Sequence, residues 1–330
     1  MIKVAINGFG RIGRASLKII LGRKDLRLVG VNDLGDINNL AYLLKYDTAQ
    51  KKYTVPVSVN GQYLMVGKKK IPFFQVTEPG KLPWKKLGVD VVLECTGFFT
   101  KKEDASKHLK AGAKAVIISS PTKSDDVVTV VRSVNDEKAK GQKVIANASC
   151  TTNCTAPVMK VLDEAFGIEK ALLTTVHATT GSQRTVDMAN AKDWREGRSI
   201  LGNIVPTSTG AAKATALTLP QLKDHFDGIS IRVPVVCGSI IDVVAVTKKE
   251  VTVDQINNAL IKASKSPKYR GIIEVTDEEL VSSDIVNTTA SAIVDLNFTR
   301  VVGGNLIKVL AWYDNEWGYS HRLVEMIYKV

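Results

Sequence analysis

The stretch KVAINGFGRIG, residues 3–13, decides the fold predicted for the first half of this chain. Its apolar strand leads directly into Gly8, Gly10 and Gly13, which have G-x-G-x-x-G spacing at the start of a helical pattern. The first glycine permits a tight turn, the second lets the backbone approach a pyrophosphate, and the third allows close helix–strand packing. Asp33 ends the next apolar run, where its carboxylate can accept hydrogen bonds from both ribose hydroxyls. A tight turn alone would explain lone glycines, but this combination predicts a dinucleotide site.

Outward from this motif, short apolar runs alternate with helical stretches, which is typical of a parallel sheet covered on both faces. Residues 55–74 form a hairpin or meander pattern that turns at Asn60-Gly61. We therefore predict an α/β fold whose first domain is a Rossmann domain with a mostly parallel sheet. The other apolar runs are residues 28–31, 89–94, 115–119 and 144–147, and the helical stretches include residues 12–21 and 103–111.

The pattern changes after Cys150, where a helix to about residue 166 leads to a strand ending at His177. Residues 178–209 then show little periodicity, and loops of that length are usually functional. In three later runs, apolar and polar residues alternate as in strands of a half-exposed sheet. A helical pattern near residues 253–265 separates the second run from the third. These runs are residues 229–233, 240–246 and 306–313.

Two domains follow from these patterns, in agreement with the length of 330 residues. We expect a dinucleotide-binding domain of residues 1–149, joined by a C-terminal helix at residues 315–330. Residues 150–314 would form an α+β catalytic domain with a mostly antiparallel sheet, including the long loop at about residues 178–209.

Composition excludes several classes of protein. With 45% hydrophobic and 24% charged residues, the chain is neither disordered nor collagen-like. Four cysteines in this length do not make a disulfide framework, and no C-x-x-C pair or other motif indicates a metal site. The sequence has no signal-peptide pattern and no membrane-length apolar run. We expect a soluble protein of the reducing cytoplasm.

The formal net charge of +12 would suit an anionic partner such as nucleic acid, a membrane surface or a phosphorylated metabolite. Residues 1–149 hold 26 basic and 13 acidic side chains, whereas residues 150–330 hold 19 and 20. The excess therefore belongs to the first half. Because its lysine clusters fall in expected turns and helix ends, without a nucleic-acid-binding motif, a solvated face is the simpler interpretation. A basic nucleic-acid-binding protein with secondary catalysis is kept as an alternative.

Cys150 lies where an apolar strand meets a helix, in the first helical turn. Unpaired amides and the helix dipole stabilise a thiolate there, although a cysteine can also be a small packing residue. We assign packing to the other three cysteines, Cys95, Cys154 and Cys237. His177 is the one histidine that ends an apolar strand, where α/β folds display catalytic groups, so we pair it with Cys150 as a base.

Six segments, INGFGRIGR, SCTTNC, TTVHATT, STGAAK, RVP and WYDNEWGYSHR, stand in the order and spacing of phosphorylating glyceraldehyde-3-phosphate dehydrogenases. The chain resembles this family over essentially its whole length. The resemblance implies a hemithioacetal and then a thioester on Cys150 in the oxidation of D-glyceraldehyde 3-phosphate to 1,3-bisphosphoglycerate, within glycolysis or gluconeogenesis. His177 would activate the thiol, take the hemithioacetal proton and support the oxyanion.

The same resemblance implies two anion pockets, for the attacking phosphate and for the substrate's own phosphate. The first would use Ser149, Thr151, Thr209 and Gly210, and the second Thr180, Ser182 and Arg232, with Arg195 as a further candidate. Without the family, residues 207–210 would be read as a helix N-cap, which is compatible with anion binding.

For NAD, the matching positions include Asp33 and, in the last segment, Asn315 for the carboxamide and Tyr319 near the nicotinamide. The long loop resembles one that packs between subunits, which implies a homotetramer. The other matching positions are Asn7, Gly8, Phe9, Gly10, Arg11, Ile12, Asn32, Thr96, Gly97 and Ser119. The Phe9 side chain would either cover the adenine or pack in the core.

Some positions depart from the family. Thr77 stands where an arginine near the adenine is common, which weakens one contact. Gly35 and Ala189 leave room near the 2′-hydroxyl, so NADP remains open as a second cofactor beside NAD. Residues 235–238 replace a Thr-x-Asn pattern near the phosphate pockets. The related erythrose-4-phosphate dehydrogenases are an alternative, but the intact STGAAK segment argues against them because it supplies the attacking-phosphate pocket.

Overall fold

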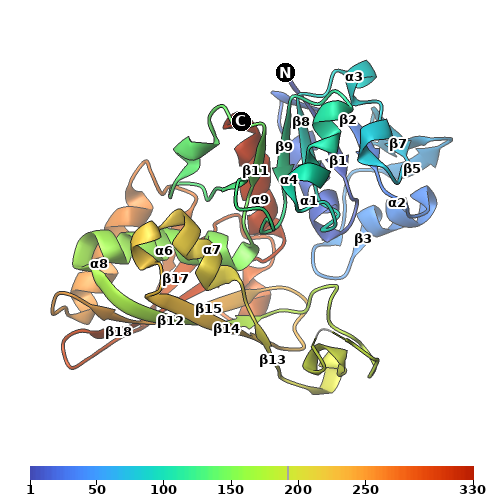
Figure 1. Ribbon diagram of the computed structural model, residues 1–330. Coiled ribbons are helices and arrows are strands. Elements are labelled where there is room, and N and C mark those ends of the chain that lie inside the picture. Colours follow the sequence, from blue (N-terminus) through green and yellow to red (C-terminus); the bar gives the residue numbers. More distant parts are fainter. Residues whose placement is uncertain (192) are drawn as a thin grey trace. The chain divides into compact units, whose positions relative to one another are not determined.

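The chain forms two compact units in the computed structural model, which describes residues 1–191 and 193–330 (Figure 1). Unit 1 consists of Met1–Val130, Asp136–Ala148 and Ser320–Val330. Unit 2 consists of Val131–Asn135 and Ser149–Tyr319. Within the described residues, no helix is both long and apolar enough to span a bilayer.

Unit 1 is built on a nine-stranded sheet in the order β10-β11-β9-β8-β1-β2-β7-β6-β5. Neighbouring strands from β10 to β7 are parallel, and β7, β6 and β5 form an antiparallel meander, so the predicted mostly parallel sheet is confirmed. The strands are β1 Ile2–Asn7, β2 Leu26–Asn32, β5 Val57–Asn60, β6 Tyr63–Val66, β7 Lys69–Phe74, β8 Val91–Glu94, β9 Ala115–Ile118, β10 Val128–Thr129 and β11 Val144–Ala146. A separate ribbon pairs β3 Tyr46–Asp47 with β4 Lys51–Lys52.

The helices of unit 1 connect these strands. The helix predicted over residues 103–111 is two short helices that meet at Ser106. The helices are α1 Arg11–Leu21, α2 Ile37–Lys45, α3 Trp84–Leu87, α4 Lys102–Ala105 and α5 Lys107–Lys110, with 3₁₀ turns at Pro79–Lys81 and Asp136–Ala139. The chain ends with α9 Trp317–Glu325, which begins in unit 2, and a 3₁₀ turn at Met326–Tyr328.

Unit 2 is built on a seven-stranded sheet in the order β13-β14-β12-β15-β18-β17-β16. Only two neighbouring pairs, β12 with β14 and β16 with β17, are parallel, so the predicted mostly antiparallel sheet is confirmed. The strands are β12 Ile168–His177, β13 Val205–Ser208, β14 Phe226–Arg232, β15 Ser239–Thr247, β16 Ile273–Thr276, β17 Ala292–Val302 and β18 Leu306–Tyr313. The sequence patterns did not reveal β16 and β17.

Three helices lie along one face of this sheet: α6 Cys150–Phe166, α7 Ala211–Thr218 and α8 Val253–Lys265 (Figure 1). The side chain of Ser149 caps α6 by accepting a hydrogen bond from Thr152 N, which fixes where the helix begins. The long loop after His177 contains 3₁₀ turns at Arg195–Gly197 and Ile200–Gly202, and others occur at Pro220–Leu222 and Ser282–Ile285. The long loop was expected to run to residue 209, but it ends earlier, because β13 begins at Val205 and pairs with β14.

Candidate functional site

Cys150 and His177 lie side by side in unit 2, with Cys150 Sγ 3.4 Å from His177 Nε2. Cys150 is the first residue of α6, as predicted, and His177 is the last residue of β12. The side chain of Arg232 reaches the same place because it ends the neighbouring strand β14, in register with His177. The fold thus brings a thiol, an imidazole and a guanidinium together.

The contacts of His177 fix which ring nitrogen faces the thiol. Nδ1 lies 2.7 Å from Ala178 O, and Arg232 Nη1 lies beside Nδ1 and donates to Ala178 O over 3.3 Å. Nδ1 thus meets both an acceptor, Ala178 O, and a donor, Arg232 Nη1, so these contacts are compatible with either tautomer; the one that serves catalysis carries its proton on Nδ1 and donates it to Ala178 O. In that tautomer Nε2 is free of hydrogen and can accept the proton of Cys150.

Burial controls the charges of this pair. Burial raises the pKa of the Cys150 thiol, against the lowering effects of Arg232 and of the Thr151 amide and hydroxyl. Burial and, to a smaller extent, the charge of Arg232 together lower the pKa of His177 to about 3. The expected thiolate-stabilising helix start is therefore present but outweighed by desolvation. Arg232 favours the ionised sulfur and disfavours the imidazolium.

Tyr313 is a fourth member of the site, and the sequence analysis did not identify it. Its hydroxyl lies 2.9 Å from both Thr151 Oγ1 and Thr175 Oγ1. Its ring meets the His177 ring edge to face, with centroids 5.9 Å apart. An aromatic residue at the end of an apolar strand resembles ordinary core, so only its place beside Asn315 in the last segment could have marked it.

The residues expected to hold the attacking phosphate stand at two helix starts. Ser149 caps α6 with its side chain, and Thr151 lies in the first turn of that helix. Gly210 precedes α7, and the Thr209 hydroxyl accepts a hydrogen bond from Ala211 N. The predicted cap is therefore confined to residues 209–210, because Thr207 belongs to β13.

The residues expected to hold the substrate phosphate fall into two groups. Thr180 and Ser182 form an exposed turn with Gln183, a residue that sequence reasoning missed; Gln183 accepts hydrogen bonds from Thr180 N and Oγ1. Arg232 lies instead beside His177. In the described part of the chain, no recorded side-chain contact joins Arg195 to any of these residues, although Arg195 N donates to Asp193.

The segment after Pro234, which departs from the family pattern, is buried at Cys237 and Gly238 and exposed at Val236. Val235 O accepts hydrogen bonds from Thr179 N and Oγ1, which ties the start of the long loop to this segment. Cys237 is buried with Sγ 3.2 Å from Asp314 Oδ1, and burial raises the pKa of its thiol. The packing roles predicted for Cys237 and Cys154 are confirmed, whereas Cys95 is only partly buried.

In unit 1 the glycine turn has the geometry that a dinucleotide requires. A Cβ on Gly13 would lie 2.1 Å from Gly8 O, so only glycine allows this helix–strand packing. A Cβ on Gly10 would meet nothing within 4 Å, and no side chain caps α1 at that glycine. The N-terminal turn of α1 thus fits a pyrophosphate.

Asp33 closes the same turn with its carboxylate. Its two oxygens accept hydrogen bonds from Phe9 N (2.6 Å) and Gly35 N (2.8 Å), which hold it at the end of β2. The Phe9 side chain is fully buried, so it packs in the core and does not cover an adenine. Arg11 forms an ion pair with Asp47 at 2.7 Å, and Ile12 follows it within α1.

The remaining expected cofactor residues lie at other strand ends or in unit 2. Asn7, Asn32, Thr96, Gly97 and Ser119 end or follow β1, β2, β8 and β9. Thr77 lies in the bend that follows β7. Asn315 Oδ1, in unit 2, accepts hydrogen bonds from Gly238 N and Ser239 Oγ, and Tyr319 is buried in the same unit. No group of three or more His, Cys, Asp or Glu among residues 1–191 and 193–330 could hold a metal ion.

A dinucleotide-binding sheet and a thiol–imidazole pair define a cysteine-containing oxidoreductase of the Rossmann class. The family model described as "Glyceraldehyde 3-phosphate dehydrogenase, NAD binding domain" matches residues 2–102, and that described as its "C-terminal domain" matches residues 149–315. The chain belongs to the glyceraldehyde-3-phosphate dehydrogenase family. NAD is its cofactor, because the matched NAD-binding domain contains the glycine turn and Asp33.

The similarity to known proteins extends over almost the whole length of this chain and of each relative. The chain is 50% identical over 327 residues to a glyceraldehyde-3-phosphate dehydrogenase of Geobacillus stearothermophilus, covering 98% of this chain and 97% of the relative. It is 50% identical over 328 residues to one of Streptomyces coelicolor, with the same coverage. It is 47% identical over 327 residues to glyceraldehyde-3-phosphate dehydrogenase 1 of Bacillus subtilis, again covering 98% and 97%.

Proposed function

We propose that this protein oxidises D-glyceraldehyde 3-phosphate to 1,3-bisphosphoglycerate in glycolysis or gluconeogenesis, with inorganic phosphate and reduction of NAD. The observation that carries the proposal is the 3.4 Å contact between Cys150 Sγ and His177 Nε2 in a chain of this family. Aldehyde oxidation through sulfur retains enough free energy in a thioester for phosphate to attack it.

The first half-reaction uses the thiol and the imidazole. His177 Nε2 takes the Sγ proton as the sulfur adds to the aldehyde carbon, and returns it to the oxyanion to give a neutral hemithioacetal. His177 then removes the hydroxyl proton as the hydride departs, which leaves a thioester on Cys150. NAD, when bound, supplies the hydride acceptor. The aldehyde carbon loses two electrons in this step, and the cofactor gains them.

The second half-reaction releases the product. A phosphate oxygen attacks the thioester carbon, the C–S bond breaks, and the departing sulfur takes the proton that His177 holds, which restores the thiol. We assign the attacking phosphate to Ser149, Thr151, Thr209 and Gly210, because hydroxyls and free amides gather at the two helix starts. We assign the substrate phosphate to Thr180, Ser182 and Arg232, with Arg195 as a further candidate.

In unit 1, the dinucleotide contacts that we propose are the glycine turn, Asp33 and the strand ends named above. In unit 2, we propose Asn315 and Tyr319 as contacts of the nicotinamide. The hydrogen bonds from Phe9 N and Gly35 N hold the Asp33 carboxylate where it would repel a 2′-phosphate, so we propose NAD over NADP. Gly35 and Ala189 leave space for NADP as a secondary cofactor. The functional domains would divide at Cys150, with residues 315–330 rejoining residues 1–149.

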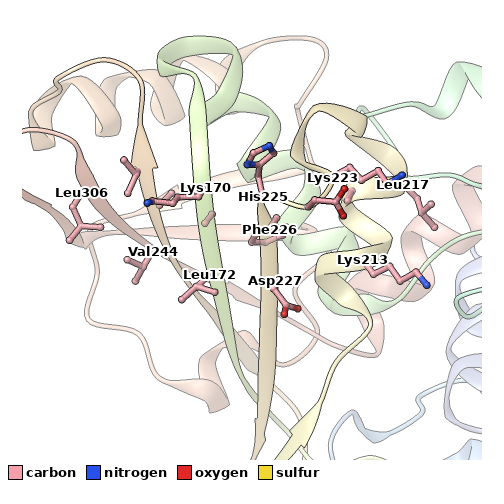
Figure 2. Close-up of a pocket in the computed structure, with 15 residues that line it drawn as sticks. Lys170, Leu172, Lys213, Leu217, Lys223, His225, Phe226, Asp227, Val244 and Leu306 are labelled. Carbon is pink, nitrogen blue, oxygen red and sulfur yellow. The ribbon is translucent and has the colours of Figure 1, made fainter.

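We propose a homotetramer in the cytoplasm. Large apolar side chains are exposed in the long loop, with Trp194 85%, Leu201 70% and Ile204 70% accessible. A pocket of about 910 Å³ in unit 2 is lined by residues of β12, β14, β15, β18 and α7, and the apolar side chains of Leu172, Val244 and Leu306 are among them (Figure 2). Such apolar patches support subunit contacts. Four cysteines without disulfides, one of them a nucleophile, suit a reducing compartment.

Initial rates test the proposal. We expect reduction of NAD by glyceraldehyde 3-phosphate to depend on inorganic phosphate, and NAD to be used more efficiently than NADP. An erythrose-4-phosphate dehydrogenase would prefer the four-carbon aldehyde and turn over without phosphate, so both aldehydes are compared with and without phosphate. Light scattering coupled to size-exclusion chromatography gives the number of subunits. A folded protein that reduces neither cofactor would refute the assignment.

A further inference from the structure

The strand order of unit 1 reverses between β1 and β8. From β1 the chain continues to β2 on one side, whereas β8 and β9 lie on the other side. In open α/β sheets, ligands bind outside the carboxyl ends of the strands at such a reversal. Asn7 and Glu94, the last residues of β1 and β8, are paired in register at this point. The side chains that fix the positions of these two strand ends therefore affect the geometry of the cofactor site.

Glu94 is an acidic side chain buried at this edge, with 1% exposure. Its carboxylate accepts hydrogen bonds from Asn7 Nδ2 at 2.6 Å and from His108 Nε2 at 3.0 Å. Its other oxygen accepts from Thr96 N at 2.8 Å and from the Thr96 hydroxyl. Four donors occupy both oxygens, which offsets the cost of burying this group.

His108 and Trp84 orient the carboxylate from behind. Both side chains are fully buried, and Trp84 Nε1 donates to His108 Nδ1 over 3.0 Å. An indole N–H can only donate, so Nδ1 is the acceptor and the ring proton sits on Nε2. His108 therefore donates to Glu94. His108, which stands among lysines in the sequence, therefore has a fixed tautomer and a fixed partner.

The hydrogen bonds continue from Glu94 to the glycine turn. Asn7 Oδ1 accepts from Asn32 Nδ2 at 2.7 Å, and Asn32 O accepts from Gly8 N at 2.8 Å. Glu94 thus connects Thr96, two residues beyond β8, with the end of β1, the end of β2 and the first glycine of the turn. All these positions are ones that we assign to the dinucleotide.

We propose that Glu94 is a positioning residue for the dinucleotide. It holds the Thr96 backbone and the Asn7 amide in their binding geometry before the cofactor arrives, and His108 and Trp84 hold Glu94. Preorganised groups bind a ligand more tightly because the conformational entropy of ordering them is lost during folding and not during binding. This inference rests on the proposed binding of NAD to unit 1. It gives a positioning role to Glu94, His108 and Trp84, which are not among the residues expected to contact the cofactor.

The test is the Glu94→Gln variant, which keeps the size of the side chain but turns an amide N–H₂ toward donors on one side. We expect the Kd for NAD, measured by calorimetry, to rise at least 10-fold. The kcat at saturating NAD and the KM for glyceraldehyde 3-phosphate should stay within about twofold. The rate of Cys150 alkylation without NAD reports on unit 2 and should not change.

Asp295 provides a matched control in unit 2. It is also 1% exposed and accepts a hydrogen bond from an indole, that of Trp312, at 3.2 Å. We expect Asp295→Asn to lower thermal stability without changing the Kd for NAD. An equal loss of stability in Glu94→Gln with an NAD Kd within twofold of wild type would mean that Glu94 is merely structural, and would overturn the inference.

Trp84→Phe gives a second, milder variant. Without the indole N–H, the His108 tautomer is no longer fixed, and we expect the Kd for NAD to rise at least threefold. If Glu94→Gln does not fold, this variant decides, and an unchanged Kd overturns the inference. If the wild-type protein does not bind NAD, the proposed function itself fails. If wild type binds NAD and both variants bind equally well, only the role of Glu94 is refuted.

Discussion

Arg232 lies beside both members of the thiol–imidazole pair, and its charge acts on them in opposite directions. Arg232 is the largest cause that lowers the pKa of Cys150, and it also lowers the pKa of His177. Replacing it in an Arg232→Gln variant should therefore raise both pKa values. A nearby opposite charge shifts a pKa by about one to three units, so we expect Cys150 to move up by at least about one unit, or about 1.4 kcal/mol.

The assay is the rate of Cys150 alkylation by iodoacetamide, an uncharged reagent, as a function of pH. Only the thiolate reacts, so one unit of pKa reduces the rate near pH 7 about 10-fold. Arg300→Gln is the control, because Arg300 is also in unit 2 and donates to the carbonyls of Asn297 and Thr299. An alkylation profile that shifts to lower pH in Arg232→Gln, or does not shift, would refute the electrostatic role of Arg232.

Three further variants test the roles assigned to other residues. His177→Asn should lower kcat about 10²- to 10⁴-fold, because an amide cannot take the Cys150 proton, and an unchanged kcat would exclude His177 as the base. Asp33→Asn should raise the ratio of NADP to NAD efficiency about 10-fold or more, and a constant ratio would show that its charge does not select the cofactor. Tyr313→Phe removes the hydroxyl that Thr151 and Thr175 share, although Thr175 keeps its hydrogen bond to Ile240 O; the two lost hydrogen bonds cost about 0.5–1.5 kcal/mol each, so calorimetry should show a lower melting temperature, and equal stability would contradict the shared hydrogen bonds.

The sequence predicted those parts of the fold whose local pattern agrees with their surroundings. The helix from Cys150 to Phe166 is where the pattern put it, because Ser149 supplies a cap and Gly167 ends the helix. The strand β17 escaped detection because its alternation is interrupted. Its register against β18 shifts between Asp295 and Arg300, and Asp295 is a buried charged residue in its interior.

The candidate site also has parts that the sequence predicts and parts that only the tertiary fold reveals. Cys150 and His177 were predictable because both stand at junctions where strands end or helices begin. The pKa of Cys150 was not, since burial is a property of the packed site and exceeds the local effect of the helix start. Glu94 and His108 were overlooked because they are 14 residues apart, and their contact depends on the tertiary fold. An acidic residue that ends an apolar strand was the available signal.

The proposed reaction depends on a thioester on Cys150 that inorganic phosphate cleaves. The most direct test is a rapid-mixing measurement of NADH formation from glyceraldehyde 3-phosphate and NAD, with and without phosphate. We predict a burst of at most one NADH per Cys150 followed by slow turnover when phosphate is absent, fast steady turnover when it is present, and no burst in Cys150→Ser. Steady turnover that is independent of phosphate, or a burst that survives in Cys150→Ser, would contradict the proposed reaction.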